Sequence, residues 1–493
     1  MSVLAVDAGT TGVTALVVGD DARVLARGYQ EFPQHFPQPG WVEHTPEEFW
    51  QAALAACTTA LAAAESTPTC LGITNQRETA VVWDRETLRA PRRAIVWQDR
   101  RTAALCQRLR DQGHEDWVSE LTGLRLDPYF TGTKLTWLSE EDPDTWAGVR
   151  EGRVAVGTVD SYVIARMTGG RLHVTDASNA SRTLLFDIAG GGWSDELSEL
   201  LDVPLSALPE VVPSYGVIGR TDPSAFLGLD LPIAGIAGDQ QAALFGQACY
   251  DVGDTKCTYG TGSFVLTNTG DRLVRSDAGL LTTVAWLTPD GELVYALEGS
   301  IFVTGSAIQW LRDGLQILGS APESEAVART VPDTGGVVFV PALTGLGAPD
   351  WDPAARGALL GITRGTTRAH VVRATLEAIA FEVGDVVDTM TSDAGEESGR
   401  AALKVDGGAS ANDLLCQLQA DRLQAPVERP EIQETTGLGA AFLAGLGTGV
   451  WSSQDELAAT WRLDRRFEPG TRDEAGLRRW RAAVERAKGW ADI

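Results

Sequence analysis

The chain has 493 residues, of which 44% are hydrophobic and 22% charged, as in soluble globular proteins with more than one domain. Its net charge of −26 argues against binding to nucleic acid or anionic membranes, since either would need basic patches. Six cysteines without a CxxC pair and five scattered histidines exclude a disulfide framework and a zinc centre, and predict reduced thiols in a cytoplasmic protein. No signal peptide or membrane-spanning stretch is recognised, so membrane insertion is not expected.

The N-terminal segment predicts three short strands, at residues 3–6, 13–18 and 23–28. A loop of small residues, Asp7-Ala8-Gly9-Thr10-Thr11-Gly12, joins the first two. Glycines let the backbone approach a ligand closely, and successive N–H groups in such a turn bind anions. A magnesium ion beside that anion would use Asp7. The alternative interpretation is a tight hairpin with Asp and Thr as turn formers.

Thr45-Pro46 then marks a helix start, strands follow at 70–74 and 79–83, and a helix is expected from about 100 to 112. The strand at 70–74 leads into Asn75-Gln76-Arg77-Glu78, which combines a cation, an anion and two amides. Such a set can hydrogen-bond vicinal hydroxyls, with Arg donating and Glu accepting. The alternative is a solvated, salt-bridged turn.

The apolar run Leu231 to Ile236 leads into Gly238-Asp239-Gln240-Gln241. A carboxylate at a strand end that faces a cleft can accept the proton of a hydroxyl nucleophile, so Asp239 is the candidate general base. The alternative is an N-cap for a helix at 241–247.

Two later strands also end in turns of Gly, Thr and Asp, at Gly260-Thr261-Gly262-Ser263 and Asp406-Gly407-Gly408-Ala409. Three such loops predict two α/β halves that share a cleft, with the join near residues 242–255. We therefore expect one domain at 1–245 and another at 246–493. No P-loop motif occurs and no GxGxxG opens a helix after the first strand, so neither of those nucleotide-binding folds is supported.

Together these motifs resemble the FGGY carbohydrate kinases, and the match covers almost the whole chain. The order of the matching segments is Asp7–Gly12, Asn75–Thr79, Trp97–Arg101, Tyr129–Leu138, Ala237–Gln241, Tyr259–Gly262, Gly357–Glu377 and Asp406–Gly408. Within the family, the Asn-Gln-Arg-Glu and Asp-Gln-Gln segments look like those of members that phosphorylate glycerol.

The resemblance implies two actin/ribonuclease-H-like domains that flank a deep catalytic cleft, and an enzyme that transfers phosphate from ATP, with Mg²⁺, to glycerol. It implies polyol contacts, with Asp239 as general base, from Arg77, Glu78, Trp97, Tyr129, Asp239, Gln240 and Phe264. It implies nucleotide contacts from Thr10, Thr11, Gly12, Thr261, Gly305, Gln309, Gly408 and Asn412. The implied magnesium ligands are Asp7 and Asp239, and a homo-oligomer, dimer or tetramer, is expected.

Two positions depart from the family. Members of the family that phosphorylate glycerol often carry an arginine that reaches the phosphates where this chain has Thr14. Some relatives are also inhibited by fructose 1,6-bisphosphate through a loop with Gly and Arg, whereas Thr221 to Asp230 offers no Arg or Lys and two carboxylates. Two alternatives therefore stay open: a family member acting on a pentulose or another polyol, and a non-catalytic actin-like nucleotide-binding protein.

Overall fold

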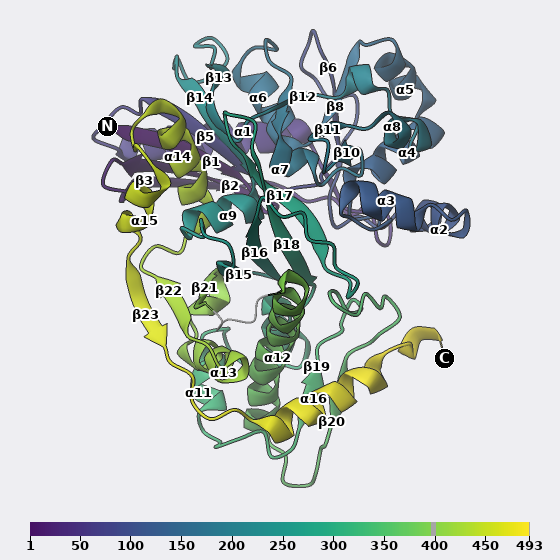
Figure 1. Cartoon of the computed structure of the whole chain (residues 1–493), viewed down its shortest axis with the longest axis vertical. Coiled ribbons are helices and arrows are strands. Elements are labelled where there is room, and N and C mark those ends of the chain that lie inside the picture. Colours follow the sequence, from purple (N-terminus) through teal and green to yellow (C-terminus); the bar gives the residue numbers. More distant parts are fainter. Residues whose placement is uncertain (396–400, 493) are drawn as a thin grey trace.

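The computed structural model describes residues 1–395 and 401–492, which form two halves that each contain a large mixed sheet (Figure 1). The first sheet has the order β13-β14-β5-β1-β2-β3. Its strands are β1 (Ser2–Ala8), β2 (Gly12–Gly19), β3 (Val24–Glu31), β5 (Cys70–Asn75), β13 (Tyr215–Arg220) and β14 (Pro232–Gly238). The second sheet has the order β17-β18-β16-β15-β21-β22-β23. Its strands are β15 (Thr255–Tyr259), β16 (Ser263–Gly270), β17 (Leu281–Leu287), β18 (Leu293–Ile301), β21 (Leu403–Asp406), β22 (Val427–Pro430) and β23 (Leu463–Phe467).

The two sheets repeat one topology. In the first, β1, β2 and β3 form an antiparallel meander, and β5 and then β14 add parallel to β1. In the second, β15, β16 and β18 form the meander, and β21 and β22 add in parallel. This duplication is the expected two-domain α/β architecture.

The predicted N-terminal elements are confirmed. The strands β1 and β2 are apolar along nearly their whole length because both faces of the sheet are covered. Pro46 opens α1 (Pro46–Ala63), where its missing N–H and fixed φ cost nothing, and α1 packs on β2 and β3. The expected helix at 100–112 is α2 (Ala103–Asp111).

Two helices lie between the sheets. The helix α9 (Asp239–Gly246) contacts β15 and β16, and α14 (Thr435–Thr448) contacts β1, β5 and β14. They also pack on each other, within a core that contains residues of both sheets. The sequence segment of α14 lies in the second half of the chain but covers the first sheet, so the division at residues 245 and 246 stays a proposal.

The remaining elements surround these layers. On the first half they are β4 (Glu43–His44), β6 (Val81–Asp84), β7 (Ala94–Ile95), α3 (Glu115–Thr122), α4 (Thr131–Glu141), α5 (Pro143–Arg150), β8 (Val154–Gly157), α6 (Val159–Met167), β9 (Val174–Asp176), α7 (Ala177–Ala180), β10 (Phe186–Asp187), β11 (Gly192–Trp193), α8 (Asp195–Leu200) and β12 (Glu210–Val212). On the second half they are α10 (Gly305–Gln309), α11 (Glu323–Ala328), β19 (Val338–Val340), β20 (Ala358–Leu360), α12 (Arg368–Ala394), α13 (Asp413–Leu423), α15 (Gln454–Thr460) and α16 (Glu474–Ala487). Among the described residues, no helix has the length and apolar character needed to cross a bilayer.

We expect Gly72→Ala to destabilise the protein by about 1–3 kcal/mol, because it overpacks a tight contact. A Cβ atom on Gly72 of β5 would lie 2.0 Å from the carbonyl oxygen of Ala440 in α14. The measurement is urea denaturation of the two variants Gly72→Ala and Gly192→Ala. Gly192 faces open space, so its variant is the control. Equal stability of the two variants would contradict the close packing of α14 on β5.

Candidate active site

The parallel arrangement of β1, β5 and β14 gathers three predicted segments at one edge of the first sheet. Asn75, at the end of β5, is in register with Ala8 of β1 and with Gly238 of β14. The carboxyl ends of neighbouring parallel strands meet at the same edge, which is where ligands bind in open α/β sheets. Asp7 near the end of β1, Arg77 after β5 and Asp239 after β14 therefore lie at one edge of the sheet.

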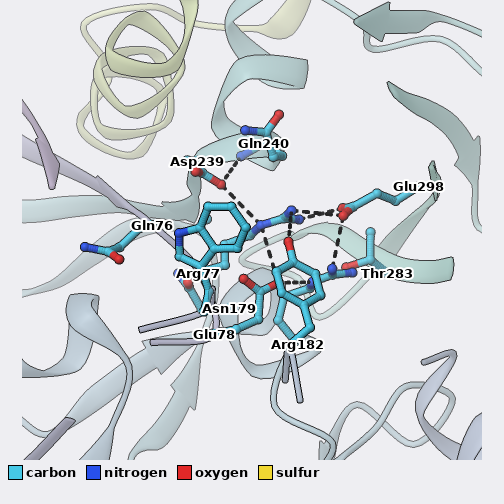
Figure 2. Close-up of polar contacts among 12 residues, drawn as sticks. Gln76, Arg77, Glu78, Asn179, Arg182, Asp239, Gln240, Thr283 and Glu298 are labelled. Carbon is cyan, nitrogen blue, oxygen red and sulfur yellow. Dashed lines mark hydrogen bonds and ion pairs between the residues drawn. The ribbon is translucent and has the colours of Figure 1, made fainter. Parts of the chain in front are cut away.

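The guanidinium of Arg77 lies at the centre of this place (Figure 2). Its Nε is 3.2 Å from Oδ1 of Asp239. Its Nη1 and Nη2 donate to the two carboxylate oxygens of Glu298, at 2.5 and 2.9 Å. Only 1% of the Arg77 side chain is exposed, against 29% for Asp239, so the carboxylate of Asp239 is the more accessible of the two groups.

Glu78 is held by a second arginine. Nε of Arg182 donates to Oε1 of Glu78 at 2.7 Å, and Nη2 donates to Oε1 of Glu298 at 3.0 Å. The backbone of Glu78 has φ = 59°, in the left-handed region that is costly for a residue with a side chain. Such a conformation persists where its surroundings fix it, and Lys134 adds a bond from Nζ to the carbonyl oxygen of Glu78. The solvated-turn interpretation is wrong, because Arg77 and Glu78 are both buried.

Three predicted aromatic residues form one wall beside Arg77. The ring of Trp97 lies 5.7 Å from that of Tyr129 and 6.4 Å from that of Phe264, edge to face in both cases. The Arg77 guanidinium lies 5.8 Å from the Phe264 ring centroid. The indole N–H of Trp97 donates to the hydroxyl of Thr10 at 2.9 Å, which connects this wall to the β1–β2 turn.

Asp239 is the first residue of α9, and its N-cap is Gly238, so the N-cap interpretation of Asp239 is wrong. Its Oδ1 accepts from the backbone N–H of Gln240 at 2.7 Å. Burial raises the pKa of Asp239 above its ordinary value, while the charges of Arg77 and Lys256 act in the opposite direction. Lys256 is itself buried in β15, and its Nζ donates to Oε1 of Gln240 at 2.5 Å.

The carboxylates of Asp7 and Asp239 interact electrostatically. Burial raises the pKa of Asp7 to about 7, and the charge of Asp239 contributes. A divalent cation would offset that repulsion, and Mg²⁺ sites commonly use one or two carboxylates plus phosphate oxygens and water. The described residues contain no group of three or more His, Cys, Asp or Glu that could hold a metal, so phosphate or water would complete this site.

A cavity of about 440 Å³ lies between the β15–β16 turn, α10 and the turn after β21. Five of the predicted nucleotide residues line it: Thr261, Gly305, Gln309, Gly408 and Asn412. The other three, Thr10, Thr11 and Gly12, lie at the β1–β2 turn and not in its wall. Gly12 also packs tightly, since a Cβ there would lie 2.8 Å from the carbonyl oxygen of Gln30.

Four buried charged residues of the site were not predicted from the sequence: Lys134, Arg182, Lys256 and Glu298. A signal was present for two of them. Lys256 is the one charged residue of β15, and Glu298 is the one charged residue of the nine-residue strand β18. A lone charge in a buried strand needs a partner, so both indicate an ion pair, although neither indicates which residue supplies it.

Comparisons with known proteins agree with this arrangement. The model of the FGGY family of carbohydrate kinases, N-terminal domain, matches residues 2–246, and that of the C-terminal domain matches residues 255–448. A glycerol kinase of Aromatoleum aromaticum is 55% identical over 493 residues, with 99% of each chain covered. Glycerol kinase 2 of Thermotoga maritima is 52% identical over 498 residues, covering 99% of each chain.

Among solved structures, glycerol kinase of Plasmodium falciparum with ADP superposes with a TM-score of 0.91 at 34% identity, and the match covers 99% of this chain and 98% of that one. A xylulose kinase of Lactobacillus acidophilus shares the fold, with a TM-score of 0.87 at 20% identity, covering 100% and 97% of the two chains. The family models, the full-length relatives and the duplicated fold together establish that this chain belongs to the FGGY family of carbohydrate kinases.

Proposed function

We propose that this protein is an ATP-dependent glycerol kinase that forms sn-glycerol 3-phosphate. The observation that carries the proposal is the buried pair Arg77 and Glu78 with the partly exposed Asp239, beside the aromatic wall. A small polyol needs charged donors and acceptors for its hydroxyls and an apolar face for its carbons. Full-length relatives that are 50–55% identical and are named glycerol kinase support the same substrate.

In this proposal Asp239 is the general base. Its carboxylate takes the proton of the terminal glycerol hydroxyl while that oxygen bonds to the γ-phosphorus of ATP. The bond from the γ-phosphorus to the bridging oxygen breaks, and ADP leaves with the electron pair. Arg77, Glu78, Tyr129 and Gln240 hold the remaining hydroxyls, and Trp97 and Phe264 contact the carbon chain. Closure of the two halves excludes water and so limits ATP hydrolysis.

The residues predicted to bind the nucleotide have a separate role. Thr261, Gly305, Gln309, Gly408 and Asn412 bind ATP in the 440 Å³ cavity, and Thr10, Thr11 and Gly12 donate to its phosphates. Asp7 and Asp239 would hold Mg²⁺, which neutralises phosphate charge when bound. Thr14 is uncharged and pairs with Asp7 and Tyr29 in the sheet, so the arginine contact of other family members is absent at that position.

The test is ADP release measured against glycerol, xylulose, ribulose and erythritol. Turnover with glycerol above the others supports the proposal. Preference for a pentulose would identify another kinase of the family. Nucleotide binding without turnover on any acceptor would favour the non-catalytic, actin-like alternative.

We further propose a cytoplasmic location and a homo-oligomer, dimer or tetramer. All six cysteines are free and buried, which fits a reducing compartment. Light scattering at several protein concentrations measures the oligomeric state.

We expect no inhibition by millimolar fructose 1,6-bisphosphate, even at low ionic strength. The cations beside the Thr221–Asp230 loop are already paired with its carboxylates: Arg220 with Asp230 at 2.6 Å, and Arg171 with Asp222 at 3.0 Å. A bisphosphate needs guanidinium or ammonium partners, and these would have to give up their present ones. The measurement is initial rate against bisphosphate concentration. Half-inhibition below the millimolar range, lost in Arg220→Ala, would contradict the expectation.

A further inference from the structure

We propose that Glu298 and Arg182 are positioning residues of the acceptor site, and that Glu298, from the second sheet, sets the orientation of Arg77, from the first. The inference rests on the proposed function, because it assigns these residues to the binding of the polyol. Both residues are fully buried, so they act through Arg77 and Glu78 and do not themselves contact substrate.

The Arg77–Glu298 contact has the two-pronged geometry that fixes a guanidinium in one plane. Both terminal nitrogens of Arg77 donate to Glu298, and each reaches a different carboxylate oxygen. A planar fork bound at both terminal nitrogens cannot rotate without breaking both bonds. Its Nε edge is therefore aimed at Asp239 (Figure 2), where it lies 3.2 Å from Oδ1.

Arg182 connects the remaining acceptor groups to the same carboxylate. It bridges Oε1 of Glu78 and Oε1 of Glu298, at 2.7 and 3.0 Å. Its guanidinium carbon lies 5.6 Å from the ring centroid of Tyr129. One side chain therefore contacts two of the residues proposed to bind glycerol, and it fixes the carboxylate of Glu78.

The network joins the two halves of the molecule at the acceptor site. Arg77 and Glu78 follow β5, Arg182 follows α7, and Glu298 belongs to β18 of the second sheet. Two arginines and two glutamates balance in charge, and burial makes each dependent on its partners. The acceptor site is consequently complete only while β18 lies against the turn that follows β5.

Glu298→Gln is the first test. It keeps the side-chain shape but removes the charge and one acceptor oxygen from Arg77. We expect the KM for glycerol to rise at least about 10-fold, because truncating one partner of a buried charge pair is costly. The KM for ATP should change less than about 2-fold, because none of the predicted ATP-binding residues forms one of the described hydrogen bonds with Glu298. The control is Glu292→Gln, an exposed residue before the same strand, which should leave both constants unchanged.

The double variant Arg182→Gln/Glu298→Gln separates positioning from mere stability. It removes one charge of each sign, so its melting temperature should recover relative to Glu298→Gln, while the KM for glycerol stays raised. If Glu298→Gln alone does not fold, the double variant provides the test of the proposal. An unchanged KM for glycerol, a parallel rise in both KM values, or a KM that recovers with the melting temperature would overturn the proposal. If the unmodified enzyme does not phosphorylate glycerol, the proposed function fails, and the positioning test is run with its best acceptor.

Discussion

Asp239→Asn should lower kcat by roughly 10²–10⁴, the usual contribution of a positioned acid or base. The substitution keeps the shape of the side chain and an oxygen that can still face Arg77 and accept from the N–H of Gln240. It removes the negative charge beside Arg77 and the capacity to take a proton. Glycerol binding should therefore weaken far less than turnover, which titration calorimetry with glycerol measures separately from the rate.

Asp290→Asn is the matched control, since Asp290 is exposed in the turn between β17 and β18. It should keep the activity of the unmodified enzyme. If Asp239→Asn keeps more than about a third of the kcat, Asp239 is not the base.

The pH profile of the unmodified enzyme checks the same assignment. A base works only when deprotonated, so activity should fall as the pH drops through the pKa of Asp239. Burial raises that pKa above the ordinary 3.8. The acid limb of kcat/KM should therefore lie at higher pH than an unperturbed aspartate would give, and this limb should be absent from the residual rate of Asp239→Asn.

Local features of the chain were predictable from the sequence. The strands β1, β2 and β3 follow from short apolar runs with turn residues between them, and α1 follows from Thr45-Pro46. These signals depend on neighbouring residues only. The position of α14 was not predictable, because its small residues indicate close packing without indicating that the partner is the first sheet.

The acceptor site was predicted only in part for the same reason. Arg77, Glu78 and Asp239 stand out because each follows a strand in a run of polar residues. Arg182 and Glu298 contact the acceptor site only because the fold brings residues 77, 182 and 298 together. No local sequence pattern predicts those long-range contacts. Of the predicted residues that line the 440 Å³ cavity, Gly305, Gln309 and Asn412 were expected from the family resemblance alone, because they are unremarkable in the sequence, whereas Thr261 and Gly408 belong to turns that stand out there.

Glycerol should be preferred over any pentulose by at least roughly 10²-fold in kcat/KM. The polar atoms of the site are already committed in a fixed geometry: Arg77 to Glu298, Glu78 to Arg182, and Gln240 to Lys256. These side chains cannot reorient to hydrogen-bond a longer sugar whose hydroxyl groups lie at other positions. An acceptor that fits badly leaves buried donors and acceptors unpaired, and this penalty discriminates more strongly than a difference in apolar contact.

The measurement is the initial rate of ADP release with glycerol, erythritol, xylulose and ribulose at saturating ATP, after subtraction of the rate without acceptor. Erythritol, which adds one hydroxymethyl group to glycerol, should fall between glycerol and the pentuloses if the fixed polar groups set the limit. The Trp97–Tyr129–Phe264 wall adds a steric limit on the carbon side, so enlarging the pocket by Phe264→Ala should narrow the gap between glycerol and erythritol. Comparable efficiency of the unmodified enzyme on xylulose or ribulose would contradict the fixed geometry and assign the protein to the pentulose kinases of its family.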